Sequence, residues 1–171
     1  MKLLKYLLIV FVVSFTNMNA QDNNIVGKTN KKVLQSNPEY KWFEENYNSY
    51  NTNPELVRQI KDLLHNNNFS IEVYFGTWCS DSQREVPSLI KILDQANFKY
   101  GRLTMIGVDE DKVVPDVSEE KRQKLDIQYV PTIIIYKDGV ELNRYVEYAR
   151  ETLEQDLIKI LSKKPYKHSY L

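Results

Sequence analysis

The single cysteine of this chain, Cys79, is the side chain best suited to chemistry. It lies in the run Thr77-Trp78-Cys79-Ser80-Asp81-Ser82, directly after the apolar stretch 71–75. This pattern predicts a strand followed by a helix, which places Cys79 where unpaired amides and the helix dipole favour a thiolate. We therefore predict that Cys79 is a nucleophile, and we weigh this against an inert, buried cysteine that only fills space.

The spacing Cys79-x-x-Ser82 is a dithiol C-x-x-C pattern in which a hydroxyl replaces the second sulfur. The Ser82 hydroxyl can donate a hydrogen bond to the thiolate and so tune it. Two capping boxes, Ser82-x-x-Glu85 and Ser80-x-x-Gln83, explain the same serines equally well. Both interpretations stay open from the sequence.

Two charged neighbours also bear on the thiol. Asp81 suits the helix start, but its negative charge disfavours a nearby thiolate. Arg84 can offset that charge, or it can simply lie on the solvent face. Ser80 and Asp81 are therefore predicted to tune the site.

No metal or cofactor is expected. His65 and His168 are far apart and lack the spacing of metal ligands. The acidic run 109–111 with Asp116 does not follow the calcium-loop pattern and is expected to be a solvated loop. The sequence also has no phosphate-binding glycine loop.

The front of the chain predicts export. Lys2 and Lys5 precede an apolar run and a polar segment that ends at Ala20, the order of a signal peptide over residues 1–20. The apolar run is shorter than the roughly 20 residues that span a bilayer, so no stable membrane insertion is expected. A periplasmic or extracellular location follows, or the lumen of the endoplasmic reticulum in a eukaryote.

The charge balance excludes some partners. Without Lys2 and Lys5 the chain keeps 21 basic residues against 23 acidic ones, from 23 of each in the full sequence. Near-neutral, interspersed charge argues against nucleic acid or an anionic membrane as the partner. About 150 residues then remain, enough for one domain with a core.

The remaining chain divides into a leader, a domain and a tail. Residues 21–37 are rich in Asn, Lys and Gln and predict a flexible leader. A helical extension over 38–66 follows, with one helix marked by an aromatic stripe and a second starting at Asn53-Pro54. The domain is expected over 38–165 and the tail over 166–171. The stripe consists of Tyr40, Phe43, Tyr47 and Tyr50.

The domain itself alternates strands and helices. Strands are predicted at about 70–76, 102–109, 132–136 and 141–146, with a turn at Asp138-Gly139 before the last. Helices are predicted after Cys79, across 117–126 and at 153–161, and Pro87 should kink the first of them. A strand–helix–strand order makes the first two strands parallel.

This order of elements resembles the thioredoxin family. The resemblance rests on Trp78-Cys79 after a buried strand, on Pro87 eight residues later, on the strand and hairpin of 130–139, and on the closing helix. It implies an α/β, thioredoxin-like fold with a central four-stranded mixed sheet, two strands parallel and two antiparallel. Helices should cover both faces, and the N-terminal helical segment is an addition.

The resemblance also implies a substrate groove. Pro131 would be cis and lie against Cys79, while Val130 and Trp78 would line the groove and bind an extended segment. An ordinary trans proline at the start of a strand is the alternative. Val73 stands where many family members carry a buried carboxylate, and the neighbouring Glu72 falls on the opposite sheet face.

Both departures, Ser82 and Val73, affect the release of a captured substrate. We therefore predict a thiol–disulfide exchange protein that forms mixed disulfides with protein thiols or disulfides, as an isomerase or as a reductase dependent on an external thiol or reductase partner. The alternative is a non-catalytic binding module, chaperone or adaptor. A monomer is expected, and a dimer linked through Cys79 is a third option.

Overall fold

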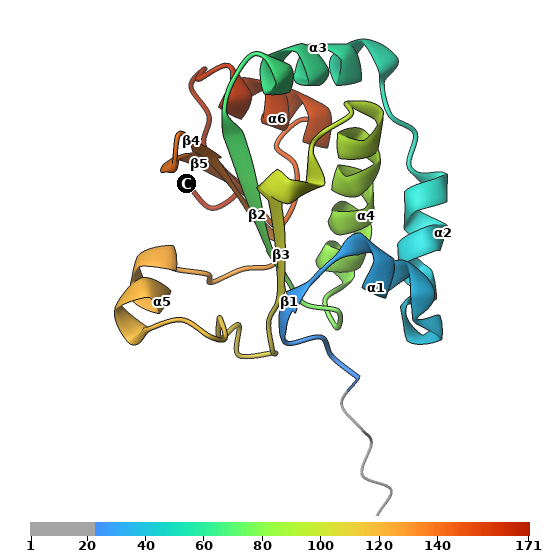
Figure 1. Ribbon diagram of the computed structural model, residues 1–171, viewed down its shortest axis with the longest axis vertical. Coiled ribbons are helices and arrows are strands. Elements are labelled where there is room, and N and C mark those ends of the chain that lie inside the picture. The colour runs from blue at the N-terminus through green and yellow to red at the C-terminus, as the bar shows by residue number, and fades with distance from the viewer. Residues whose placement is uncertain (1–22) are drawn as a thin grey trace, which may run out of the picture.

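The computed structural model describes residues 23–171, and the predicted signal peptide at 1–20 lies outside them (Figure 1). Five strands form one sheet in the order β1-β3-β2-β4-β5. The strands are β1 (Gly27–Thr29), β2 (Phe69–Phe75), β3 (Leu103–Gly107), β4 (Thr132–Lys137) and β5 (Val140–Val146). The helices are α1 (Lys31–Ser36), α2 (Lys41–Ser49), α3 (Pro54–His65), α4 (Ser80–Gln95), α5 (Glu119–Leu125) and α6 (Leu153–Leu161), with 3-10 turns η1 (Pro38–Tyr40) and η2 (Tyr100–Arg102).

The pairing of the four predicted strands is confirmed. Strands β2 and β3 run parallel, while β4 is antiparallel to both β2 and β5. The hairpin turn between β4 and β5 uses Asp138 and Gly139, both with positive φ, as an Asp-Gly turn requires. Strand β4 lies inside the sheet, and its run Ile133 to Ile135 is fully buried.

A fifth strand corrects the predicted four-stranded sheet and the predicted leader. Strand β1 pairs antiparallel with β3, with Gly27 opposite Gly107, and α1 follows it with Leu34 fully buried. Gly107 is required there, because a Cβ on it would lie 2.1 Å from the carbonyl oxygen of Ile25. Residues 23–37, the described part of the predicted leader 21–37, are therefore not a flexible leader. A three-residue strand carries too little pattern to be read without its partner.

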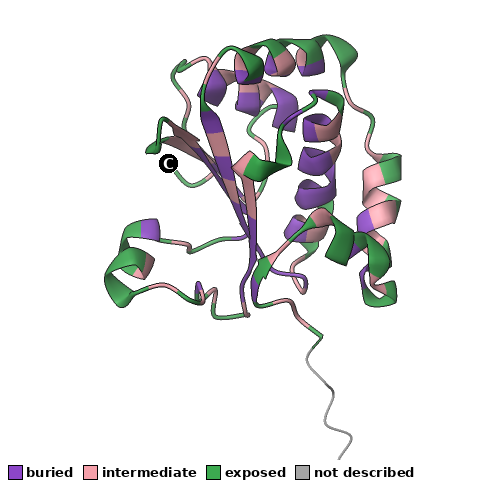
Figure 2. Ribbon diagram, in the orientation of Figure 1, coloured by how far each residue is buried: buried purple, intermediate pink, exposed green. Residues whose placement is uncertain are grey.

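The two faces of the sheet are covered unequally. Helices α3, α4 and α6 pack on one face, where β2 contributes Phe69, Ile71, Val73 and Phe75 to the main core. Tyr74 points the other way, into a smaller cluster with Leu125 of α5. Figure 2 shows α4 largely buried, whereas the outer sides of α1 and α5 are exposed.

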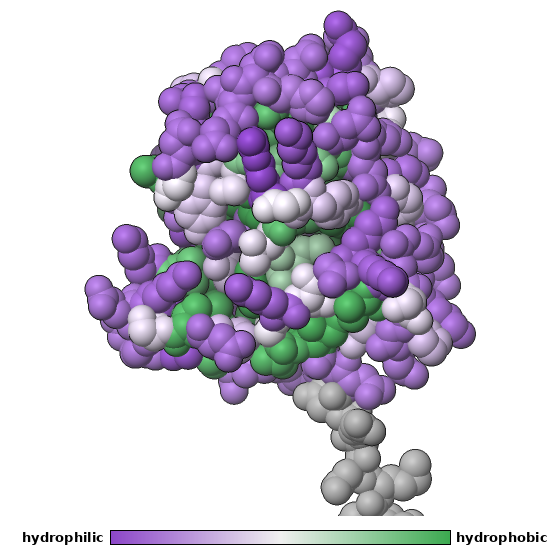
Figure 3. All heavy atoms as spheres, in the orientation of Figure 1, coloured by the Kyte–Doolittle hydropathy of each residue, from purple (hydrophilic) through white to green (hydrophobic). Residues whose placement is uncertain are grey.

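The surface in this orientation is mostly hydrophilic. Apolar side chains gather between α5 and the ends of β1 and β3 that lie nearest to it (Figure 3). Over residues 23–171, the structure has no helix that is both long enough and apolar enough to cross a bilayer.

The N-terminal extension is joined to α4 by a specific hydrogen bond. The aromatic stripe packs on the core as predicted, with Phe43 fully buried. Pro87 lies inside α4 and has no N–H for the carbonyl of Gln83, one turn earlier. The side chain of Asn46 in α2 donates to that carbonyl at 3.1 Å instead. Helix α2 therefore supplies the donor that the proline removes.

A carboxylate near the end of α4 makes a second junction. Asp94 accepts hydrogen bonds from Lys31 Nζ at 2.6 Å, Tyr47 at 2.7 Å and Tyr100 at 2.6 Å. Burial opposes the charged form of this carboxyl, but the three donors prevail and lower the pKa of Asp94. Asp94 thus links α1, α2 and η2 to α4.

Candidate functional site

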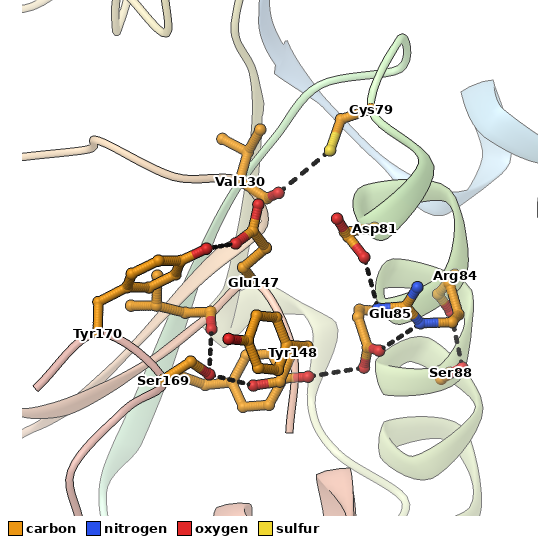
Figure 4. A network of polar contacts seen from close by, with 12 residues as sticks. Cys79, Asp81, Arg84, Glu85, Ser88, Val130, Glu147, Tyr148, Ser169 and Tyr170 are labelled. Atoms are coloured by element: carbon orange, nitrogen blue, oxygen red, sulfur yellow. Dashed lines mark hydrogen bonds and ion pairs between the residues drawn. The ribbon is translucent and has the colours of Figure 1, made fainter. Parts of the chain in front are cut away.

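Cys79 is the N-cap residue of α4 and is only partly buried. Its Sγ lies 3.2 Å from the carbonyl oxygen of Val130, to which the thiol donates, as Figure 4 shows. The Val130–Pro131 peptide bond is cis. Cys79 and Pro131 belong to segments more than fifty residues apart in the chain, and the fold brings them together at one end of the sheet.

Trp78 is held rigidly next to the cysteine. Its indole Nε1 donates to the carbonyl of Val108 at 3.1 Å, and Lys112 Nζ lies 5.8 Å from the centre of the ring. A Cβ on Gly76 would lie 2.4 Å from the ring, so glycine is required beneath it. The predicted groove residues Trp78, Val130 and Pro131 thus surround Cys79.

Ser82 has a different partner from either of those predicted. The hydroxyl is fully buried, and its oxygen accepts the N–H of Gly76 at 3.2 Å. Within the described chain no hydrogen bond joins Ser82 to Cys79, so the predicted bond to the sulfur is not formed. Both capping boxes are also wrong, because Cys79 is the N-cap and Ser80 and Ser82 lie inside α4. Ser82 holds the turn between β2 and α4.

A chain of charged side chains runs from the surface into the core. Asp81 pairs with Arg84 at 2.6 Å, and Arg84 Nε pairs with Glu85 at 2.8 Å (Figure 4). Glu85 in turn accepts the hydroxyl of Tyr145 at 2.8 Å. Burial, together with the charge of Glu85, raises the pKa of Tyr145, so this tyrosine stays a neutral donor. Arg84 therefore offsets the charge of Asp81, one of the two roles considered for it.

Glu72 and Val73 lie on opposite faces of the sheet, as predicted. Val73 is fully buried in the main core, while Glu72 accepts the hydroxyls of Tyr74 at 2.7 Å and Tyr136 at 3.0 Å on the α5 side. Strand β2 therefore offers no carboxylate on the α4 side. Within α4 the buried carboxylate is Glu85, whose sequence pattern predicted only a part in a capping box.

Three further residues beside the cysteine were missed. Glu147 follows β5 with φ +64°, and its N–H donates to the carbonyl of Pro131 at 2.8 Å. The ring of Tyr170, from the predicted tail, stacks on Tyr129 with 3.8 Å between ring centres. Tyr129 directly precedes Val130, so the sequence could have indicated that Tyr129 lies near the site. Nothing in the sequence connects Tyr170 to Tyr129. Residues 166–171 are consequently not a free tail.

Among residues 23–171, His, Cys, Asp and Glu side chains do not come together in groups of three or more that could hold a metal ion. The surroundings of the Cys79 sulfur are a tryptophan, a proline and a backbone carbonyl. Such a site can place an extended chain against a thiol.

Comparison with known proteins agrees with this geometry. The Thioredoxin family model matches residues 53–159. Thioredoxin AMT13 of Alternaria alternata is 35% identical over 80 residues, which cover 47% of this chain and 60% of the relative. Thioredoxin Asp f 28 of Aspergillus fumigatus is 28% identical over 89 residues, which cover 52% of this chain and 74% of the relative.

These alignments span only part of each protein. Thioredoxin-2 of Saccharomyces cerevisiae, for example, is 33% identical over 73 residues, 43% of this chain and 62% of the relative. Among solved structures, a protein of unknown function from Pseudomonas aeruginosa has a TM-score of 0.54 at 13% identity, covering 81% of this chain and 89% of its own. An HIV epitope-scaffold has a TM-score of 0.60 at 13% identity, with 82% and 95% covered. These structures establish likeness of fold alone.

Proposed function

The chain belongs to the thioredoxin family, and we propose that it is a thiol–disulfide exchange protein in which Cys79 alone forms mixed disulfides with protein substrates. The observation that supports this most directly is the position of its sulfur. Cys79 is partly exposed, and its Sγ lies 3.2 Å from the Val130 carbonyl oxygen, beside Pro131. The position three residues later carries the buried hydroxyl of Ser82 in place of a second thiol.

The first step needs only Cys79. Its thiolate attacks one sulfur of a substrate disulfide, so that a Cys79–substrate S–S bond forms while the substrate bond breaks. The second substrate sulfur leaves as a thiolate and takes up a proton. Trp78, Val130 and Pro131 hold the attacked segment in an extended conformation by main-chain and apolar contacts.

The second step needs a thiol from elsewhere. An external thiol, or a thiol of the substrate itself, must attack the mixed disulfide and return Cys79 to its thiolate. Attack by an external thiol gives a reductase, and attack by the substrate's own thiol gives an isomerase. Ser82 cannot attack in this way, and its bond to Gly76 ties it to the turn.

The experiment compares the wild-type protein with Cys79→Ser, the variant closest in size. Each is incubated with an oxidised model protein and an external thiol, and the rate of disulfide reduction or reshuffling is measured. The wild type should react faster and should form adducts that a reductant releases. Equal rates for the two proteins would refute a covalent role for Cys79.

A binding module is the second candidate. The thiol of Cys79 donates to the Val130 carbonyl, and both Ser82 and Val73 lack the groups that would release a captured substrate. A chaperone or adaptor with the same groove would bind unfolded protein equally well as wild type and as Cys79→Ser. Binding that survives this substitution, without covalent adducts, would favour this candidate.

We also propose that the protein is exported and acts in the periplasm or outside the cell. The support is the order of charged, apolar and polar residues over 1–20. N-terminal sequencing of the protein from its native host tests this, since an intact Met1 would contradict it. A non-reducing gel of the same sample separates a monomer from a dimer linked through Cys79.

A further inference from the structure

The last residues of the chain pack beside the candidate site. Ser169 Oγ lies 2.6 Å from the carbonyl oxygen of Tyr148 (Figure 4). The same hydroxyl oxygen lies 3.1 Å from the carbonyl oxygen of Val146. The ring of Tyr170 stacks on Tyr129 at an interplanar angle of 7°, and Tyr148 packs edge-on against it with ring centres 6.1 Å apart. We name Tyr129, Tyr148 and Tyr170 the aromatic wall.

The aromatic wall remains open to solvent. The exposed fractions are 36% for Tyr129, 44% for Tyr148 and 42% for Tyr170. Tyr145, by contrast, is fully buried in the core. The wall therefore leaves ring surface available beside the groove.

Glu147 connects the aromatic wall to the cysteine. Its Oε2 accepts the hydroxyl of Tyr170, while its Oε1 accepts no hydrogen bond in the described chain. Figure 4 shows the carboxylate next to the Val130 carbonyl, the group that receives the Cys79 thiol. Burial and the nearby charge of Asp81 raise the pKa of Glu147 by more than the charges of Arg84 and Lys112 lower it.

Building on the proposed function, we propose that Glu147 and the aromatic wall form a subsite for a lysine or arginine side chain of the protein substrate, next to the cysteine that Cys79 attacks. Tyrosine faces attract cations, and a carboxylate oxygen without a donor can pair with one. The two features meet at the edge of the groove where an extended substrate would pass.

The charges next to Glu147 agree with a cationic ligand. Lys124, Arg144 and His168 line the neighbouring cavity beside Tyr129 and Tyr170, where Glu141 pairs with Arg144. Three carboxylates, Asp81, Glu85 and Glu147, face two cations, Arg84 and Lys112. Arg84 is already held by two of those carboxylates. Lys112 lies over the ring of Trp78. The remaining negative charge is that of Glu147.

The test uses two synthetic peptides, each with one cysteine carried as its disulfide with thionitrobenzoate. The peptides differ only in the residues that flank the cysteine, which are lysine in one and glutamate in the other. Attack by Cys79 forms a Cys79–peptide disulfide and releases one thionitrobenzoate, whose absorbance gives the rate. We expect the lysine peptide to react about five- to tenfold faster at low salt, with the ratio falling as salt is added.

Three variants should bring the ratio of the two rates close to one. Tyr170→Ala removes part of the wall, and a stop codon after Lys167 removes the whole C-terminal segment. Glu147→Gly removes the carboxylate, and glycine suits the positive φ of this position, so the fold should be kept. Glu120→Gln, an exposed substitution on α5 with the same change in charge, should keep the wild-type ratio.

The outcomes separate the two proposals. Equal rates for both peptides in the wild type would overturn the subsite and leave the proposed function standing. Release from neither peptide, as in Cys79→Ser, would overturn both. A truncated protein that reacts faster with every peptide would mean that the C-terminal segment obstructs the groove, and this too would overturn the subsite.

Discussion

A Ser82→Cys substitution places a second thiol three residues after Cys79. Residues three apart at a helix start have Cα atoms about 5 Å apart, which lies within the range that a disulfide spans. The substitution removes the acceptor of the Gly76 N–H, so we expect a loss of about 1 kcal/mol in the free energy of unfolding. The protein should nevertheless fold, because a thiol is close in size to a hydroxyl.

The Ser82→Cys protein should resolve its mixed disulfide much faster than the wild type does. A well-placed internal thiol has an effective concentration of ~10⁵ M, against ~1 mM for an external thiol, a ratio of ~10⁸. Burial at position 82, with Val73 offering no proton acceptor, should raise the pKa of the new thiol by ~2 and cost ~10²-fold. Imperfect alignment can cost another ~10²-fold, which leaves release faster by about 10⁴-fold.

The assay counts the thionitrobenzoate released from its symmetrical disulfide without any other thiol. The wild type should release one equivalent and remain as a mixed disulfide. Ser82→Cys should release a second equivalent and end as an intramolecular disulfide, two hydrogens lighter than the dithiol.

The control for this assay is Ser88→Cys. Ser88 is also buried in α4, but its side chain bonds the carbonyl of Arg84. This variant should release one equivalent while folded. If Ser82→Cys also stops at one equivalent, with an adduct as long-lived as that of the wild type, then position 82 is not aligned with Cys79 and our account of the site is wrong.

Three further predictions concern stability. Asn46→Ala should lower the free energy of unfolding by about 1–3 kcal/mol in urea, because it leaves the Gln83 carbonyl without its donor. The pKa of Asp94 is lowered in the folded state, so its ionised form contributes to the free energy of unfolding. This contribution should be full above about pH 4 and should be lost as the pH falls through the lowered pKa. Asp94→Asn should remove this part of the pH dependence of the free energy of unfolding. Tyr145→Phe should lower the thermal midpoint by about 2–6 °C, because Glu85 loses a buried donor.

Exposed residues of the same types provide the controls. Asn48→Ala, in the same helix as Asn46, and Asp62→Asn, on the outer side of α3, should each change the free energy of unfolding by less than about 0.5 kcal/mol. If either control matched its partly buried counterpart, the named hydrogen bonds would not be the cause.

Most of the fold could be predicted because its signals are local. Strand β4 is an unbroken apolar run, α3 begins at an Asn-Pro cap, and the Asp138-Gly139 turn joins β4 to β5. Each of these patterns lies within a dozen residues, which is the range over which periodicity and capping can be read. The single cysteine at a strand-to-helix junction was equally readable.

The parts that were missed depend on distant partners. Residues Gly27–Thr29 form a strand because they pair with the edge of β3. Tyr170 stacks on Tyr129, which lies more than forty residues earlier in the sequence. Ser82 was misread for a different reason, because its partner is close in the sequence. A serine near a helix start suggests a cap, yet the Ser82 hydroxyl accepts the N–H of Gly76, six residues earlier. This bond depends on how the turn between β2 and α4 folds back, and no spacing pattern in the sequence indicates it.

The bond from Asn46 to Gln83 also shows that the recognisable domain and the folding unit are different. A fragment trimmed to the family match, residues 53–159, would lose α2, and with it the cover that Phe43 gives to the core. The fragment would leave the Gln83 carbonyl of α4 without its donor, and it would expose the apolar side of α4. In this protein the N-terminal boundary of the family match therefore cuts through a packed core.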